Sequence, residues 1–241
     1  MALLMEESPE TPRAKLPTTP VLITAATKWE AEPLAKGLGL SPAGENRFEG
    51  TVGGRRVVLI KTGMGAVKTA AVLEKDFVAG DFGLAFSAGL CGAMQEGIRT
   101  GDLVADAQGI ELDYVAPLRE TAAALEIPFH FGKILHTNIV LTPEKKRRLG
   151  AEHRMLACDM ETAAVRRWAS AKIPVIGARV VLDEIDEAIP EDAPQSEDAA
   201  ALARYALTHA AQLPRLIRTG MKSARAMKNL TRFLKAYLET I

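Results

Sequence analysis

Residues 20–27 read PVLITAAT, a short apolar run that ends in small residues and a threonine. Similar runs recur along the chain and alternate with alanine- and leucine-rich stretches whose apolar residues are three or four apart. This alternation is typical of the strands and helices of an α/β sheet. The predicted strands are 20–26, 47–53, 56–62, 83–88, 102–107, 133–137 and 173–182. The predicted helices are 29–38, 66–79, 117–126, 143–149, 160–171 and 197–211.

Length and composition fit a globular protein with one large domain or two small ones. The chain has 241 residues, of which 48% are hydrophobic and 25% are charged. Basic and acidic residues both number 30, so no net field would recruit nucleic acid. We expect a flexible tail over 1–19, one catalytic domain over 20–212 and a basic C-terminal extension over 213–241.

Several features favour a cytoplasmic protein. No apolar run is as long as a membrane-spanning helix, and the first residues lack the basic start and long apolar centre of a secretion signal. Cys91 and Cys158 lie in apolar contexts, so we expect buried free thiols rather than a disulfide framework. The four histidines show no metal-binding spacing, and we predict no metal site.

Two glycine-rich segments follow predicted strands. TGMGAVKTA (62–70) opens a helix, where backbone N–H groups can meet an anion or a sugar hydroxyl. It lacks the third glycine of a dinucleotide fingerprint, and a simple strand-to-helix turn would also explain it. FSAGLCGAM (86–94) has small residues that would let a ligand approach the backbone, and we interpret it as a turn at the carboxyl edge of the sheet.

Acidic residues stand at the ends of two later apolar runs, in LACDMETAA (156–164) and ARVVLDEID (178–186). Ionised carboxylates are costly to bury and are rarely placed at the ends of core strands without a task. Each can also be a strand-end or helix-cap residue in water. We favour that plain explanation for Asp159, whereas Glu161 and Asp183 are the stronger functional candidates.

Taken together, TGMGAVKTA, SAGLCGAMQEGIRTGDLV, CDMETAAV and RVVLDEID resemble, in the same order, the motifs of the nucleoside phosphorylase and nucleosidase superfamily. That superfamily includes purine nucleoside phosphorylase and methylthioadenosine/S-adenosylhomocysteine nucleosidase. Within it, TPEKKRRL (142–149) and the basic C-terminal segment are most similar to the phosphorylase-like proteins of hopanoid biosynthesis, thought to remove adenine from adenosylhopane.

The resemblance implies a fold and an activity. The fold is α/β, a three-layer α/β/α sandwich around a mixed, partly closed sheet. The activity is cleavage of the N-glycosidic bond of a purine nucleoside, with adenine favoured and with no metal or organic cofactor. The nucleoside is then the small-molecule partner, and a homo-oligomer, dimeric or larger, is expected.

The family's motifs carry over to individual residues. Its ribose clamp falls on Met160 and Glu161, its arginine and aspartate on Arg179 and Asp183, and the acid of its first loop on Glu30. Cleavage builds positive charge on the sugar while electrons move into the base. Glu161 would accept hydrogen bonds from the ribose diol, Asp183 would protonate N7 of the base, and Glu30 would orient a water toward C1′. Arg179 would hold this region in place and could orient the nucleophile, so Asp183, Glu30 and Arg179 are the expected catalytic residues.

Two assignments are looser. The acid of the first loop can also fall on Glu32, because TKWEAE contains both glutamates. The base-side wall is assigned to the loop in HTNIV (136–140). The full set of expected substrate-binding residues is Met160, Glu161, Gly63, Gly65, Ser87, Ala88, Gly89, Asn138, Ile139 and Val140.

Water and phosphate are both open as the nucleophile. The phosphate-using branch binds phosphate through the arginine and serine of an R-V-G-S-C-G-A turn. Here the turn reads SAGLCGA, with Ser87 at the arginine position and Leu90 at the serine position. Because leucine cannot donate a hydrogen bond, we favour water, although Lys28 could replace the first loop's arginine. Leu90, with Leu182 in place of another family serine, also leaves open a non-catalytic nucleoside- or lipid-binding protein.

The segment from Leu213 to Leu238 has apolar residues at helical spacing with seven basic residues among them. A basic amphipathic helix can lie on an anionic membrane surface, which would place the protein at the inner face of the membrane. It can also pack its apolar stripe on the domain or on a partner subunit. We favour packing on protein, and both alternatives are open from the sequence.

Overall fold

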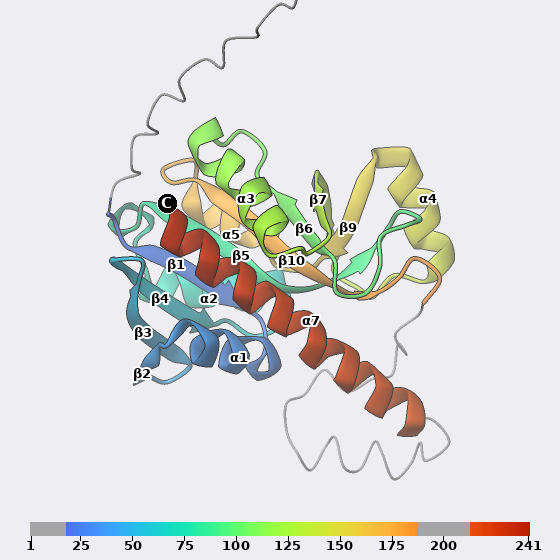
Figure 1. Cartoon of the computed structure of the whole chain (residues 1–241), viewed down its shortest axis with the longest axis horizontal. Helices are drawn as coiled ribbons and strands as arrows, with labels where there is room; N and C mark the ends of the chain where they lie inside the picture. The colour runs from blue at the N-terminus through green and yellow to red at the C-terminus, as the bar shows by residue number, and fades with distance from the viewer. Residues whose placement is uncertain (1–17, 188–212) are drawn as a thin grey trace, which may run out of the picture.

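The computed structural model describes residues 18–187 and 213–241 (Figure 1). The predicted helix 197–211 and nearly all of the predicted N-terminal tail lie outside these residues. The strands are β1 (Val21–Ala25), β2 (Ser41–Gly44), β3 (Arg47–Val52), β4 (Arg55–Lys61), β5 (Leu84–Ala93), β6 (Leu103–Asp106), β7 (Phe129–Phe131), β8 (Lys133–His136), β9 (Met155–Asp159) and β10 (Val175–Asp183). The helices are α1 (Lys28–Leu38), α2 (Ala66–Asp76), α3 (Leu112–Ala124), α4 (Pro143–His153), α5 (Thr162–Ala169) and α7 (Leu213–Thr240), with a 3-10 turn at Ala79–Asp81.

The strands form one mixed sheet. Its main path runs β2-β3-β4-β1-β5-β10-β6-β7, and β9 joins the end of β5 and pairs with β8. The central strands β4, β1, β5 and β10 are parallel, and β2 and β3 are antiparallel to their neighbours. Strand β6 is antiparallel to β10 and parallel to β7. Because β5 is long, its first half lies between β1 and β10 and its last residues pair with β9. The predicted α/β fold with a mixed sheet is confirmed.

Helices cover both faces of the sheet. Successive side chains of a strand point to opposite faces, so a strand buried on both sides is apolar throughout. Val21 and Ile23 of β1 pack in the core shared with α1, α3 and α7, whereas Leu22 packs in the core shared with α2 and α5. These two cores and the sheet between them make the predicted α/β/α sandwich.

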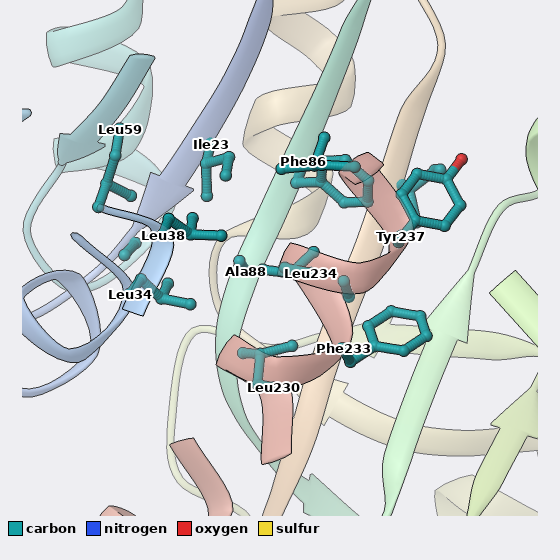
Figure 2. Packing of buried hydrophobic residues seen from close by; sticks show 14 of the residues in the cluster. Ile23, Leu34, Leu38, Leu59, Phe86, Ala88, Leu230, Phe233, Leu234 and Tyr237 are labelled. Atoms are coloured by element: carbon teal, nitrogen blue, oxygen red, sulfur yellow. The ribbon is translucent and has the colours of Figure 1, made fainter. Parts of the chain in front are cut away.

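The C-terminal helix α7 crosses one face of the sheet and completes its core (Figures 1 and 2). Leu230, Phe233, Leu234 and Tyr237 are fully buried, and the rings of Phe86 and Tyr237 meet edge to face with centroids 5.6 Å apart. The opposite face of the helix exposes basic side chains of Arg218, Arg225, Lys228, Arg232 and Lys235. The apolar stripe of this half of α7 packs on the domain, as favoured, and is not free to lie on a membrane.

A membrane-spanning helix was not expected from the sequence. Among the helices within 18–187 and 213–241, none is both long enough and apolar enough to cross a membrane.

The structure corrects several predicted boundaries. FSAGLCGAM is not a turn, because β5 continues to Ala93 and its small residues are paired with β10 and then with β9. The strands β2, β7 and β9 were missed; each is short, and β2 contains proline and glycine, which are uncommon in strands. Helix α3 begins five residues before its predicted start, α2 ends at Asp76, and α4 continues to His153.

Candidate active site

The carboxyl ends of the parallel strands share one edge of the sheet, where ligands bind in folds of this kind. The residues assigned to chemistry follow these ends or lie beside them. Glu30 is in the first turn of α1, after β1, Gly65 precedes α2, after β4, and Glu161 precedes α5, after β9. Arg179 and Asp183 lie within β10.

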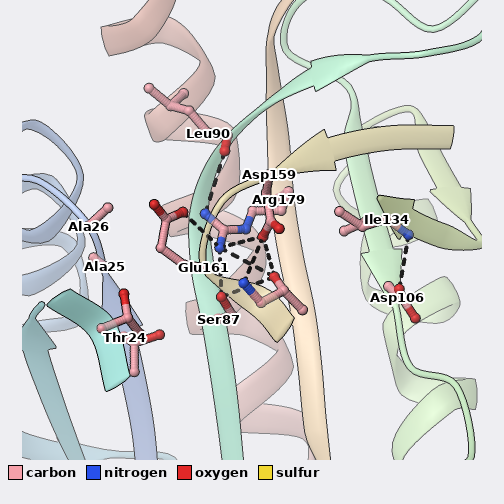
Figure 3. A network of polar contacts seen from close by, with 12 residues as sticks. Thr24, Ala25, Ala26, Ser87, Leu90, Asp106, Ile134, Asp159, Glu161 and Arg179 are labelled. Carbon is pink, nitrogen blue, oxygen red and sulfur yellow. Dashed lines mark hydrogen bonds and ion pairs between the residues drawn. The ribbon is translucent and has the colours of Figure 1, made fainter. Parts of the chain in front are cut away.

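Arg179 is the centre of a buried polar network (Figure 3). Its Nη2 lies 2.6 Å from Asp159 Oδ2 and 3.4 Å from Glu161 Oε2, and it donates to Ser87 Oγ at 2.6 Å. Burial opposes charge on this side chain, but Asp159, Glu161 and Glu30 together raise the pKa of Arg179 above its ordinary value. Arg179 is therefore a fixed cation held between two carboxylates.

Glu30 is anchored at the start of α1 and reaches across to β5. Its Oε2 accepts the Thr27 N–H at 2.9 Å in a capping box, and its Oε1 accepts the Leu90 N–H at 2.8 Å. Gly89 makes room for this contact, since its φ is +152° and an added Cβ would collide with Glu30 Oε1. The same Cβ would lie 2.9 Å from Arg179 Nη1. Gly89 thus lets Glu30 and Arg179 approach the same point of β5.

Glu161 joins this cluster to the turn between β4 and α2. Its Oε1 accepts the Gly65 N–H at 2.8 Å, while its Oε2 faces Arg179. Burial raises the pKa of Glu161, and the guanidinium of Arg179 opposes that shift. The glutamate of the expected ribose clamp, the glycine turn and the arginine, distant in sequence, therefore lie together.

Asp183 ends β10 in an adjoining cluster. Its buried carboxyl group forms an ion pair with Nζ of Lys146 from α4. The same Nζ donates to the carbonyl oxygens of Glu184 at 3.0 Å and Glu187 at 2.9 Å. Burial raises the pKa of Asp183, and the Lys146 ammonium group acts in the opposite direction. The burial of Asp183 was expected from its assigned role, and its lysine partner was not.

The two clusters meet at the end of β9. Asp159 pairs with Arg179, and the adjacent Cys158 faces Gly92, where an added Cβ would lie 3.3 Å from Cys158 Sγ and 3.0 Å from Asp183 Oδ2. Burial raises the pKa of Cys158 to about 12, so this thiol stays neutral. Cys158 and Cys91 are both buried free cysteines, as predicted.

Two of the expected binding residues contribute little through their side chains. Ser87 is fully buried, and its hydroxyl is already used by Arg179 and by Thr162 Oγ1 at 3.1 Å. It is a partner of the arginine rather than a free donor for a ligand. The side chain of Ala88 lies in the core beside α7 (Figure 2), so only its backbone could meet a ligand.

The remaining expected residues border this edge. Met160 and Gly63 are partly buried, and they neighbour Glu161 and the Gly65 turn in sequence. The expected base-side wall, Asn138, Ile139 and Val140, forms the loop after β8. The Thr137 N–H donates to the Asp159 carbonyl at 2.8 Å, which fixes the start of this loop beside the acids. Asn138 and Ile139 are exposed to solvent and Val140 is half-buried.

Sequence reasoning missed the parts played by two charged residues. Asp159 accepts the Thr162 N–H at the start of α5 at 3.1 Å, but it is buried rather than in water, and it also neutralises Arg179. Its place two residues before Glu161 was the available signal. Lys146 lies in a run of four basic residues, 145–148, and nothing in their spacing singles it out.

The chemistry of these clusters is that of acids, a cation and backbone amides. Within the described part of the chain, no group of three or more histidine, cysteine, aspartate or glutamate side chains is placed to hold a metal ion. The arrangement can hold hydroxyl groups on carboxylates, orient a small nucleophile and exchange a proton at Asp183.

Comparisons with known proteins bear on the fold. Residues 20–120 match the family model described as the phosphorylase superfamily. A search of curated proteins gave no match. Among solved structures, futalosine hydrolase of Helicobacter pylori is similar with a TM-score of 0.67 and 17% identity, over 93% of this chain and 99% of that one.

Two nucleosidases show the same similarity. The 5′-methylthioadenosine/S-adenosylhomocysteine nucleosidase of S. pneumoniae, solved with a transition-state inhibitor, has 23% identity and a TM-score of 0.61, over 90% of this chain and 99% of that one. The corresponding enzyme of Helicobacter pylori has 16% identity and a TM-score of 0.68, over 93% and 99%. The chain thus has the phosphorylase-like fold, and its residues 20–120 match the phosphorylase superfamily.

Proposed function

We propose that the protein cleaves the N-glycosidic bond of a purine nucleoside, with adenine as the base and water as the nucleophile. The observation that carries the proposal is the convergence of Glu161, Glu30 and Arg179 on the turn at Gly65 and on Gly89 of β5. Carboxylates beside glycine backbone suit a sugar. The sugar hydroxyls can donate hydrogen bonds to the carboxylates, and the face of the sugar can approach a backbone that carries no side chain. The similarity to nucleosidases supports the same activity.

The reaction can be written on these residues. The oxygen of water forms a bond to C1′ while the C1′–N9 bond breaks and its electron pair moves into the base. Asp183 gives a proton to N7 of the base, and Glu30 takes the proton that the water loses. Glu161 accepts hydrogen bonds from the ribose hydroxyls, which strengthen as positive charge develops on the sugar. The products are the free base and the free sugar.

The structure favours water over phosphate at this site. The guanidinium of Arg179 already forms ion pairs with Asp159 and Glu161, so it is poorly placed to bind a phosphate as well. Leu90 presents an apolar side chain, and its N–H is taken by Glu30. A phosphate dianion needs charge-assisted donors, which these residues do not supply.

The narrower proposal concerns the 5′ side of the nucleoside. We propose that it carries a lipid, as in adenosylhopane, on the strength of the resemblance of TPEKKRRL and the C-terminal segment to proteins of hopanoid biosynthesis. The exposed basic face of α7 would suit a loose contact with an anionic membrane where such a substrate resides.

The test is release of free base. The protein is incubated with adenosine, methylthioadenosine, inosine and adenosylhopane, with and without phosphate, and the base is measured by chromatography. Release without phosphate supports the proposal, and strict dependence on phosphate supports phosphorolysis to ribose 1-phosphate instead. Asp183→Asn should abolish release, whereas Asp186→Asn, whose side chain is 68% exposed, should not. No release from any of the four nucleosides would favour a binding protein.

A further inference from the structure

Lys146 is a buried cation on a helix whose neighbouring basic residues face solvent. Lys145 and Arg147 are exposed, but Lys146 is 1% exposed. Gly150, one turn later on the same face, lies so close to the chain after β5 that an added Cβ would collide with the Met94 carbonyl oxygen. This close packing of α4 brings Lys146 to the end of β10.

The surroundings of Lys146 match its protonated form. An ammonium group has three hydrogens and no acceptor. Its three partners are the Asp183 carboxylate, the Glu184 carbonyl at 3.0 Å and the Glu187 carbonyl at 2.9 Å. An unpartnered buried charge is costly, so this complete set of acceptors indicates that the site is formed to hold the ammonium group of Lys146.

The acceptors belong to one acidic turn, whose side chains pair with cations from other elements. The pairs are Asp183 with Lys146, Glu184 with Arg99, Asp186 with Arg147 and Glu187 with Lys222. In three of these pairs at least one side chain is substantially exposed, so they hold the turn weakly. In the Asp183–Lys146 pair the side chains are 10% and 1% exposed. This buried pair therefore fixes the carboxyl group of Asp183.

We propose that Lys146 is a positioning residue for Asp183, whose ammonium group orients the carboxyl group and sets the pH range over which it holds a proton. The inference rests on the proposed function, in which Asp183 protonates the leaving base. Other titratable groups that face Asp183 are the thiols of Cys91 on β5 and Cys158 on β9, and Glu187 of its own turn. Within residues 18–187 and 213–241, Lys146 is the cation in contact with Asp183.

The sign of the effect follows from the charges. A general acid must be protonated, so activity falls as pH rises through its pKa, which is the alkaline limb of the profile. Without the ammonium group, burial and the Glu187 carboxylate still raise the pKa of Asp183, so Asp183 keeps its proton to higher pH. A neighbouring positive charge lowers the pKa of a carboxyl group, so Lys146→Met should move this limb to higher pH. A purely structural lysine would lower kcat without moving the limb.

The kinetic experiment compares pH profiles of kcat/KM for adenosine and methylthioadenosine. The variants are Lys146→Met, Lys146→Arg, which keeps the positive charge, and the matched control Lys145→Met on the exposed side of α4. We expect the limb to move in Lys146→Met and to stay near its original position in the other two. The inference would be overturned if the pH profile of Lys146→Met had the same shape and midpoint as that of the unmodified protein and differed only in height.

A second measurement does not depend on turnover. The titration of Asp183 is followed by carbon NMR of protein labelled at its aspartate carboxyl groups, with the Asp183 signal identified by its loss in Asp183→Asn. We expect a higher midpoint in Lys146→Met than in Lys145→Met, and equal midpoints would refute the coupling. A shifted midpoint in a protein that cleaves none of the nucleosides would count against the proposed function and not against the pairing. If Lys146→Met does not fold, Lys146→Gln replaces it in both measurements.

Discussion

Replacing Leu234 by alanine tests whether α7 is part of the core. Leu234 is fully buried and lies beside Phe86 and Ala88 of β5 (Figure 2). Truncation removes apolar contact and leaves a cavity that the sheet cannot fill, because β5 is held by strands on both sides. Such changes cost about 2 to 5 kcal/mol, and full burial places this one near 3 kcal/mol. For a domain of this size that corresponds to a fall in Tm of about 6 to 12 °C.

The assay is urea unfolding followed by circular dichroism, with calorimetry for Tm. Arg232→Ala is the matched control, because Arg232 lies on the exposed face of the same helix and its loss should change the free energy of unfolding by less than about 0.5 kcal/mol. If Leu234→Ala were no more destabilising than Arg232→Ala, α7 would not be packed on the sheet in solution, and its apolar stripe would again be free for a membrane or a partner.

Three further results are expected. Tyr237→Phe should lower the free energy of unfolding by about 0.5 to 1.5 kcal/mol in the same assay, because the Tyr237 hydroxyl donates to the Tyr114 carbonyl at 2.9 Å. Gly89→Ala should abolish base release while the protein stays folded by circular dichroism, since the new Cβ would lie 2.9 Å from Arg179 Nη1; unchanged turnover would contradict the geometry. Burial raises the folded-state pKa of Glu161 above 4.5, so the stability from its bound proton is complete below 4.5 and is lost as pH rises through the folded value. Glu161→Gln should therefore flatten the fall of unfolding free energy with pH in that window, and an unaltered slope would argue against the shift.

Local pattern was sufficient for part of the molecule. The α/β class and most strands followed from short apolar runs, because a strand buried on both faces must be apolar throughout. The start of α4 followed from Thr142 and Pro143, and the structure confirms both the cap and the proline at the first turn. Glu161 and Asp183 stood out because carboxylates at the ends of apolar runs are costly to bury.

Contacts between distant segments decided the rest. The sequence by itself determined which residues are apolar, small or charged, and hence the class of the fold and the candidate acids. Only the tertiary structure made FSAGLCGAM a strand, since its pairing with β10 and β9 is non-local. It also decided which of four adjacent basic residues is buried, because the inward face of α4 depends on the close packing of Gly150 against Met94. Likewise, only the sheet beneath α7 determined that its apolar stripe covers protein rather than lipid.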